Sequence, residues 1–372
     1  MNATPLSLYI HFPWCVRKCP YCDFNSHELG GEVPARQYVD ALLQDFNSQI
    51  DNQEQRPLVS VFMGGGTPSL FPPDALARLL ETIGRRLDLA SAEITLEANP
   101  GTFDQAHFDG YREAGINRLS IGVQSFSDAS LKAVGRIHSG NEAQRAYEGA
   151  RQAGFDRINL DLMYALPGQS MGAALEDLRT AVSLAPTHLS WYQLTIEPNT
   201  YFYRYPPKLP DGDDASRISE AGQRLLVDAG YERYEISAYA RETDQSQHNL
   251  NYWEFGDYIG IGAGAHGKLT TPEGIRRTTK SRAPGDYLAA PEKTRSDLVS
   301  PDDLVLEFLM NALRLTRGFR LQTFEQRTGL DRKALDDFIQ KATAKGLLSC
   351  DGDQVMPTEK GTEFLNDLLL LL

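Results

Sequence analysis

The sequence predicts an α/β fold, with a parallel sheet over most of the chain and a smaller α+β domain at its end. Two observations carry this prediction. Residues 6–200 alternate six short apolar runs with amphipathic segments, which is typical of successive β-α units. From about Pro301 the spacing of the apolar residues changes to that of a small helical domain with a two-stranded wing. In such a fold the chemistry is expected at the carboxyl ends of the parallel strands.

Six strands are expected, because six short runs are rich in apolar residues, as strands buried on both faces should be. Their ranges are Leu6–Phe12, Leu58–Met63, Glu93–Ala98, Arg118–Val123, Arg157–Met163 and His188–Ile196. Consecutive β-α units make such strands parallel, with right-handed crossovers. Six units are fewer than the eight of a closed barrel, so the pattern leaves open both a partial barrel and a doubly wound sheet.

Six helices are expected beside these strands, because apolar residues recur there at helical spacing. Their ranges are Ala35–Ile50, Pro73–Leu87, Phe103–Ala114, Ser127–Val134, Asn141–Ala153 and Gly172–Leu184. Gly115 and Gly154 directly follow two of these helices. A glycine at that position commonly ends a helix in the left-handed conformation, so both helices have a defined end.

The C-terminal part has the pattern of a winged helix. Helices are expected at Leu304–Leu315, Leu321–Thr328, Arg332–Lys345 and Thr358–Leu370, and the wing strands at Leu347–Ser349 and Gln354–Pro357. Winged helices that bind DNA carry a basic recognition helix. Residues 301–372 instead hold nine Lys and Arg against twelve Asp and Glu. We therefore expect no nucleic-acid binding here, and a role in capping the larger domain or docking a protein.

Composition narrows the class of protein further. The chain of 372 residues carries a formal net charge of −13, which disfavours broad nucleic-acid binding. No apolar run approaches the roughly 20 residues of a membrane span. Three of the four cysteines lie within eight residues, a pattern that suits a reducing compartment and does not fit a disulfide framework. We therefore expect a cytoplasmic protein.

The clustered cysteines are the strongest chemical signal in the sequence. Cys15, Cys19 and Cys22 follow the first strand with the spacing Cys-x3-Cys-x2-Cys. Thiolate ligands select iron–sulfur clusters, zinc or copper(I). Structural zinc takes four protein ligands, whereas a [4Fe–4S] cube held by three cysteines leaves one iron open to another ligand. A zinc site of three cysteines with His11 or His27 stays open as the alternative.

Polar and glycine residues follow the other strands at the same end of the predicted sheet. The second strand runs into Gly64–Pro68, where three glycines let a ligand approach the backbone. The later strand ends supply Glu97, Gln124, Arg136 and Asp161. Together they offer a carboxylate for an ammonium group, a guanidinium for a carboxylate and an Asp for a ribose hydroxyl. A ligand that carries these groups and an adenine would suit the set.

On these residues the chain resembles the radical S-adenosylmethionine (SAM) superfamily. Its signature is the Cys-x3-Cys-x2-Cys loop with an aromatic residue, here Tyr21, before the last cysteine. The resemblance implies a partial (β/α)6 TIM-like barrel and a [4Fe–4S] cluster on Cys15, Cys19 and Cys22. It also implies that the amino and carboxylate groups of SAM bind the open iron, which explains the missing fourth protein ligand.

Within the superfamily the chain is similar to the oxygen-independent coproporphyrinogen III oxidase group, and in that group to the HemW-type heme chaperones. The similarity covers nearly the whole chain. It rests on the segments Tyr9–Pro13, Gly64–Pro68, Ser120–Phe126, Gly135–His138, Asn159–Tyr164 and Leu166–Gln169. By this resemblance the SAM-contacting positions are Tyr9, Gly65, Gly66, Thr67, Glu97, Gln124, Arg136 and Asp161.

Two departures separate the chain from the oxidases of that group. The oxidases carry a further cysteine two residues after the third one, where this chain has Phe24. They also carry an extension before the first strand, where only five residues stand here. Both differences argue against porphyrinogen decarboxylation and favour the chaperone type.

A third feature is the segment His248–Trp253, which reads His-Asn-x-x-Tyr-Trp and is associated with heme in the HemW-like group. By this resemblance the expected heme residues are His248, Asn249, Tyr252 and Trp253. His248 is a possible iron ligand, and the aromatic rings could pack on a porphyrin. The alternative is a strand and turn that closes the open side of the barrel, with His248 hydrogen-bonded internally. His266, in the glycine-rich segment 260–267, is a second candidate.

The sequence thus predicts a heme chaperone that binds heme, a [4Fe–4S] cluster and SAM, and transfers heme to an acceptor hemoprotein. The alternative is a radical SAM enzyme that acts on a porphyrinogen. The resemblance further implies a membrane-bound respiratory enzyme as acceptor, peripheral contact with the membrane and a homodimer. We expect three parts: a radical SAM core at 1–200, an extension of the barrel at 201–300 and the winged-helix-like domain at 301–372.

Overall fold

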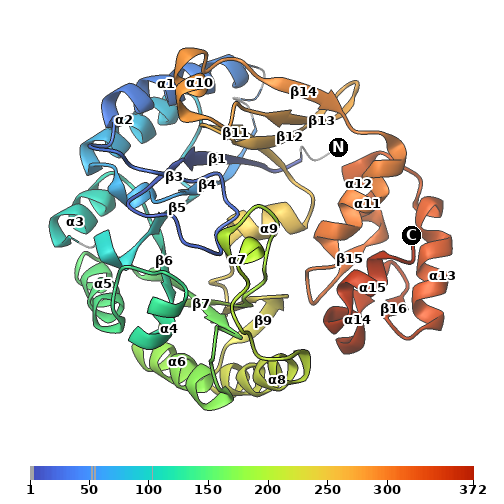
Figure 1. Cartoon of the computed structure of the whole chain (residues 1–372). Helices are drawn as coiled ribbons and strands as arrows, with labels where there is room; N and C mark the ends of the chain where they lie inside the picture. The colour runs from blue at the N-terminus through green and yellow to red at the C-terminus, as the bar shows by residue number, and fades with distance from the viewer. Residues whose placement is uncertain (1–3, 52, 54–55, 103) are drawn as a thin grey trace.

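The computed structural model describes residues 4–51, 53, 56–102 and 104–372. At the centre of this described part is one sheet of twelve strands (Figure 1). Its parallel part runs in the order β11 (Asp257–Ile261), β1 (Leu6–Phe12), β4 (Leu58–Gly65), β5 (Glu93–Ala98), β6 (Arg118–Gln124), β7 (Arg157–Tyr164) and β8 (His188–Gln193). From β1 to β8 the strands follow one another in chain order without reversal. A barrel has this order, whereas a doubly wound sheet reverses it.

Antiparallel strands extend the sheet at both edges, so the parallel strands form a partial barrel. On one side lie β12 (His266–Thr271), β13 (Gly274–Thr279) and β14 (Arg295–Leu298). On the other side lie β10 (Ala238–Ala240) and β9 (Glu232–Glu235). The predicted partial (β/α)6 barrel is therefore confirmed, with these additions at its edges.

Helices cover the outer face of the sheet, as Figure 1 shows. They are α1 (Ala35–Gln49), α2 (Pro73–Gly84), α3 (Gln105–Glu113), α4 (Asp128–Ala133), α5 (Gly140–Gln152), α6 (Met171–Leu184) and α8 (Gly212–Asp228). Local signals fix their ends. Ser139 and Glu142 form a capping box at the start of α5, and Ser170 caps α6. Each predicted helix is present within a few residues of its expected limits.

Two predictions about the sheet differ from the structure. β11 is a seventh parallel strand that the sequence reading missed, because its five residues begin with the charged Asp257 and are hard to tell from a loop. Asp257 is fully buried but is paired with Arg56 and Lys268, which makes its burial tolerable. The sixth predicted strand ends at Gln193 and not at Ile196.

The ends of some helices also differ. The helix expected at Phe103–Ala114 begins at Gln105, because the carboxylate of Asp104 accepts the Ala106 amide and acts as its N-cap. Phe103 lies outside the described residues. The predicted limit at Leu87 is late by three residues, since α2 ends at Gly84.

The C-terminal domain has the predicted winged-helix order. It contains α11 (Pro301–Ala312), β15 (Phe319–Arg320), α12 (Leu321–Thr328), a 3-10 turn η3 (Arg332–Leu335), α13 (Asp336–Ala344), β16 (Leu348–Asp351) and β17 (Gln354–Pro357). The wing has three strands in the order β15-β17-β16 instead of the expected two. The last predicted helix is divided at Phe364 into α14 (Glu359–Glu363) and α15 (Leu365–Leu369).

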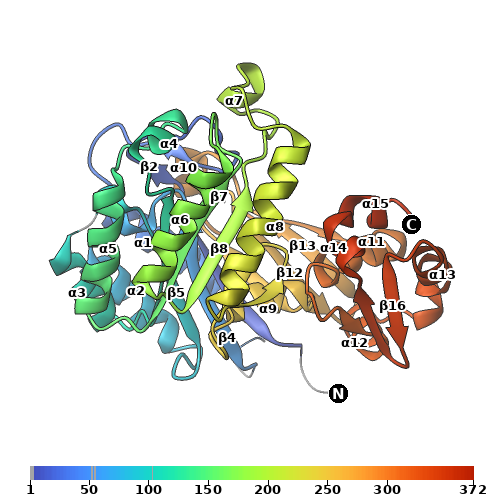
Figure 2. The ribbon, with the colours of Figure 1, turned by 90° about the horizontal axis from the view of Figure 1, so that it is seen from below.

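Two smaller features matter for the site. β2 (Trp14–Cys15) pairs with β3 (His27–Glu28), which fixes both ends of the loop that carries the cysteines. A short helix α7 (Tyr201–Arg204) projects from the rest of the fold in Figure 2. The Phe202 amide donates to the Pro20 carbonyl oxygen at 3.0 Å, so this projection is anchored to the cysteine loop. Within the described ranges, no helix is long and apolar enough to cross a membrane.

Candidate functional site

The three clustered cysteines lie at the carboxyl end of the parallel strands. Cys15 is on β2, and the loop turns between the other two, where the Cys22 amide donates to the Cys19 carbonyl oxygen at 3.1 Å. All three are free, half-buried thiols that line one cavity of about 360 Å³. Cys350 is exposed on β16, far along the chain in the wing, and does not line this cavity. The structure thus separates Cys350 from the other three cysteines.

The cysteine side chains fit an iron–sulfur cluster better than a single zinc ion. In the described part of the chain, no three His, Cys, Asp or Glu side chains gather closely enough to hold one metal ion. A cube, in contrast, takes each cysteine on a different iron and needs the sulfurs further apart. His11 is also occupied, since its ring nitrogens contact the Tyr9 hydroxyl and the Asn25 carbonyl oxygen, each at 2.9 Å.

The surroundings of the cysteines shift the pKa values of their thiols. Burial raises the pKa of the Cys15 and Cys22 thiols, while hydrogen bonds from Thr67 and Ser26 act in the opposite direction. The guanidinium of Arg136 lies 3.8 Å from the Cys19 sulfur. Thiolates in this pocket therefore require a cationic partner, which iron supplies, and Arg136 adds one fixed positive charge.

The predicted polar set lies in the same cavity as the cysteines. Seven of the eight residues expected to contact SAM line it, namely Gly65, Gly66, Thr67, Glu97, Gln124, Arg136 and Asp161. They come from the end of β4 and the turn after it, from the C-terminal halves of β5, β6 and β7, and from the turn after α4. Tyr9 is the exception, because it lines a neighbouring cavity. The individual contacts with SAM stay predictions.

Glu97 is the most strongly perturbed acid in this cavity. Its carboxylate accepts the Gly65 amide at 3.0 Å, yet burial, with the nearby charge of Asp161, raises the pKa of Glu97 to about 7. Asp161 accepts from Ser120 and Asn159, each at 2.9 Å, and burial raises its pKa as well. Two half-buried carboxylates in one cavity attract a cationic ligand when they are ionised.

Arg136 has an unpaired buried donor, and Gln124 has an uncommon backbone conformation. Arg136 donates to the Gly122 carbonyl oxygen at 2.6 Å, while its buried Nε has no partner in the described structure. Gln124 has a backbone φ of +67°, which is uncommon for a residue with a side chain, and its side-chain oxygen accepts from Tyr192 at 2.8 Å. A free donor and a strained backbone inside a cavity are typical of a binding site.

The glycine loop has a role that the sequence did not reveal. Gly65 has a φ of +113°, and a Cβ there would lie 2.3 Å from the His11 ring. A Cβ on Gly66 would lie 2.6 Å from the Trp14 carbonyl oxygen. The glycines therefore let β4 pass close to the start of the cysteine loop, in addition to lining the cavity.

Gly65→Ala is expected to destabilise the fold by about 1–3 kcal/mol, because it adds a strained φ and a clash with His11. Chemical denaturation of the wild type and the variant measures the difference. Gly30→Ala is the matched control, since a Cβ at Gly30 would meet nothing within 4 Å. Equal stabilities of the two variants would contradict the packing role of Gly65.

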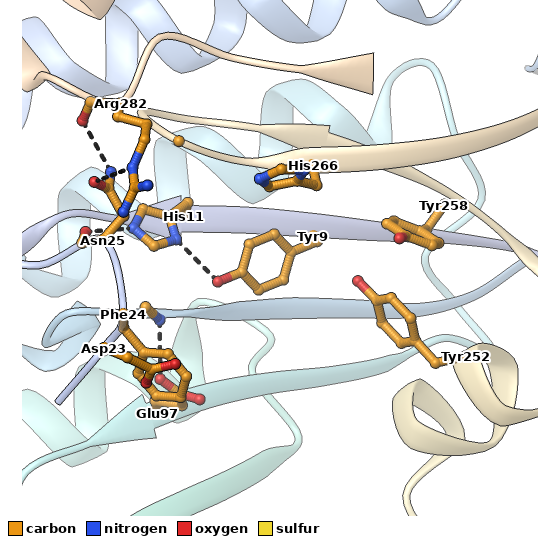
Figure 3. A pocket seen from close by; sticks show the side chains of 12 residues that line it. Tyr9, His11, Asp23, Phe24, Asn25, Glu97, Tyr252, Tyr258, His266 and Arg282 are labelled. Atoms are coloured by element: carbon orange, nitrogen blue, oxygen red, sulfur yellow. Dashed lines mark hydrogen bonds between the residues drawn. The ribbon is translucent and has the colours of Figure 1, made fainter. Parts of the chain in front are cut away.

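A second cavity of about 510 Å³ adjoins the first (Figure 3). The two share the lining residues Phe24, Gly65 and Glu97. The rest of its wall includes Tyr9, His11, Asn25, Tyr252, Tyr258, His266 and Arg282. The sequence did not indicate Asn25, Tyr258 or Arg282 as site residues. Tyr258 and Arg282 lie on β11 and in the loop after β13, which reach the site only through the sheet order, and Asn25 lies in the cysteine loop. In the first cavity the sequence also did not single out Asn159 on β7 or Tyr192 on β8 as site residues, although both lie on predicted strands.

The segment with the predicted heme residues is the helix α9 (Gln247–Trp253), so the alternative of a strand is wrong for these residues. The strand β11 and the turn after it do lie at the open side of the barrel beside β1. Ser246 caps this helix, which explains why the segment turns into a helix after a polar stretch. Its side chains do not gather at one place. Asn249 and Trp253 line the first cavity, Tyr252 lines the second, and His248 lines neither.

His248 is packed inside the fold. Its ring stacks on Phe62 with centroids 4.1 Å apart and meets Tyr252 edge-on at 4.6 Å. Burial lowers the pKa of His248 to about 3, and its Nδ1 has no partner in the described structure. The ring is therefore neutral and serves to position Tyr252, while its role as an iron ligand stays a prediction.

Comparison with known families agrees with this geometry. Residues 9–181 match the family model described as the radical SAM superfamily, and residues 299–364 match that of the HemN C-terminal domain. The first match spans the cysteine loop and all four polar residues Glu97, Gln124, Arg136 and Asp161. The second falls on the winged-helix-like domain.

Curated relatives match over the full length. The chain is 52% identical to the protein named heme chaperone HemW of Escherichia coli K12, covering 100% of this chain and 99% of the relative. It is 34% identical to heme chaperone HemW of Bacillus subtilis 168, covering 97% of each chain. Among solved structures, coproporphyrinogen III oxidase (HemN) of Escherichia coli matches with a TM-score of 0.84 at 23% identity, over 100% of this chain and 90% of that one, which shows a shared fold. The chain belongs to the HemW family within the radical SAM superfamily.

Proposed function

We propose that this protein is a heme chaperone, which binds heme, holds a [4Fe–4S] cluster with SAM, and transfers heme to an acceptor hemoprotein. The observation that carries this proposal is the 52% identity, over the whole length, to a relative named for that activity. The cavity with three free cysteines and two half-buried carboxylates supports the cofactor part of it.

The residues of the first cavity suggest how the cofactors are held. Cys15, Cys19 and Cys22 would bind three irons, and Arg136 would place a positive charge beside Cys19. Glu97 would face the ammonium group of SAM, since its carboxylate lies in the same cavity as the sulfurs. When bound, the cluster and SAM supply one-electron chemistry. The residues that line the cavity would orient the ligand.

The competing function is that of a radical SAM enzyme acting on a porphyrinogen. At the position where the oxidases carry an additional cysteine, this chain has Phe24, which is 60% exposed and lines both cavities. A phenyl ring can pack on a porphyrin but cannot exchange a proton or bind iron. Position 24 therefore favours holding a tetrapyrrole over converting one.

One anaerobic experiment separates the two functions. The cluster is reconstituted, and dithionite, SAM and coproporphyrinogen III are added while protoporphyrinogen is measured; hemin is titrated into a parallel sample. We expect stoichiometric hemin binding and no turnover. Protoporphyrinogen formed over many turnovers would reject the chaperone function, and so would the absence of hemin binding.

We further propose that the protein acts in the cytoplasm and delivers heme to a membrane-bound respiratory hemoprotein, as a homodimer in contact with the membrane surface. The resemblance to the HemW-type group supports these points. Sedimentation of the cluster-loaded protein alone measures its oligomeric state. Co-sedimentation with membranes that contain the apo-acceptor measures its contact with the membrane. A monomer that stays in the supernatant would contradict them.

The affinity for SAM is expected to depend on pH through Glu97. Because the pKa of Glu97 is about 7, its carboxylate is protonated and neutral below that pH and gives the ammonium group no anionic partner. SAM should therefore bind roughly five- to tenfold more weakly at pH 6 than at pH 7.5, as calorimetry of the reconstituted protein can measure. Glu97→Gln should bind weakly at both pH values. A wild-type affinity that does not change between them would contradict this role.

A further inference from the structure

We propose that the second cavity is the heme site, with His266 as an axial ligand of the heme iron and Arg282 as the partner of a propionate. This assignment rests on the proposed chaperone function, because heme is the cargo of that function. It differs from the expectation that His248 binds the iron.

The shape and wall of the cavity suit a flat aromatic ligand. Its volume of about 510 Å³ lies within the range of roughly 300–1,000 Å³ that ligand pockets have. Tyr9, Tyr252 and Tyr258 form part of its wall, and the rings of Tyr252 and Tyr258 are 4.3 Å apart. These side chains come from β1, α9 and β11, and Figure 3 shows them near one another, with His266 of β12 beside them. Aromatic rings pack favourably on a macrocycle.

Of the histidines around the cavity, only His266 has a ring that is available. Both ring nitrogens of His11 are engaged, by Tyr9 and by the Asn25 carbonyl oxygen. His248 is buried between Phe62 and Tyr252 and does not reach the cavity wall. His266 is exposed on β12, lines the cavity, and its imidazole makes no hydrogen bond within the described residues. A neutral imidazole is a common axial ligand of heme iron.

The positive charges near His266 favour the neutral form of its imidazole. Burial on one side, together with the charges of Arg277 and Arg282, lowers the pKa of His266. The imidazole is therefore neutral near pH 7 and has a lone pair for iron. Because the ring is exposed on its other side, an acceptor protein can reach the heme that it holds.

Arg282 supplies the charge that a heme propionate needs. It is exposed at the cavity, and its Nε donates only a long hydrogen bond of 3.5 Å to Asn25. No carboxylate within the described residues forms an ion pair with Arg282. Asp23, which also lines the cavity, lies on the opposite side from Arg282 in Figure 3. A guanidinium without an anionic partner is well suited to bind a carboxylate of the ligand.

The second cavity, proposed for heme, adjoins the first cavity, which would hold the cluster and SAM. Phe24, Gly65 and Glu97 belong to both cavities, so heme in the second one would lie beside SAM in the first. Binding of one ligand can therefore alter the wall that the other ligand contacts.

Hemin titration of the full-length, cluster-reconstituted protein tests the assignment, with binding followed as difference absorbance at the Soret band. His266→Ala is expected to weaken hemin binding at least tenfold and to shift the Soret band, and millimolar imidazole should restore the band. His248→Ala should keep the position of the wild-type band. His107→Ala, on the outer helix α3 and lining neither cavity, is the matched control.

The propionate contact has its own test. Arg282→Gln should weaken hemin binding several-fold, while hemin dimethyl ester, which has no free carboxylate, should bind both proteins equally. Arg295→Gln, exposed on β14, is the control. Wild-type affinity and spectrum in His266→Ala, or a spectral change only in His248→Ala, would overturn the heme site. A wild-type protein that binds no hemin would instead reject the chaperone function itself.

Discussion

Cys19→Ala is expected to abolish assembly of the iron–sulfur cluster. A cube held by three cysteines has no spare protein ligand, so loss of one thiolate exposes a second iron to solvent and exchange. The iron content after anaerobic reconstitution should fall from about four per chain to less than one. The broad absorbance of the cluster in the visible region should disappear together with the iron. Iron analysis and absorbance spectra of the same samples measure the effect.

The cysteine variant should lose its cofactor without losing its fold. Cys19 is half-buried, and the loop stays fixed at both ends by the pairing of β2 with β3. The free energy of unfolding should change by less than about 1 kcal/mol in the apo-protein. Cys350→Ala is the matched control, because this thiol is exposed on β16 and should leave the iron content unchanged. Full iron content in Cys19→Ala would reject the three-cysteine site.

Local patterns predicted the parallel sheet well because each β-α unit carries its own signals. The apolar runs and the helix caps are short-range features, so the six strands and their helices could be located from the chain alone. The choice between a barrel and a doubly wound sheet could not, because it depends on strand order. β11 was missed since it begins with the charged Asp257, whose burial is made tolerable by Lys268 on the next strand and by Arg56, which lies about 200 residues earlier in the chain.

The candidate site was predictable where its residues stand at strand ends. Glu97, Gln124 and Asp161 converge because the carboxyl ends of parallel strands share one edge. The second cavity was not predictable. Its wall combines β1 with α9 and β12, and both of these elements follow β1 by more than 200 residues. The same long-range packing buries His248, which a motif alone presents as a ligand.

Glu93→Ala is expected to cost about 3–5 kcal/mol of stability, because it removes one partner from a buried ion pair network. Glu93 is at the start of β5, and its side chain is 1% exposed. Its carboxylate lies 2.7 Å from Arg157 and 3.8 Å from Arg118, whose side chain is 3% exposed. Without Glu93 the guanidinium of Arg118 would be buried without its counter-charge. Denaturant unfolding measures the loss.

The same carboxylate links the barrel to the helix with the predicted heme residues. One oxygen of Glu93 accepts the His248 amide at 3.2 Å and the Ser246 hydroxyl at 3.4 Å, at the N-terminus of α9. Glu93→Gln keeps an acceptor but not the charge, so it should lose less stability than Glu93→Ala. Glu232→Ala, exposed on β9, should remain within about 0.5 kcal/mol of the wild type. If Glu93→Ala were as stable as Glu232→Ala, the network would not hold α9, and the placement of Tyr252 and Trp253 beside the cavities would depend on packing alone.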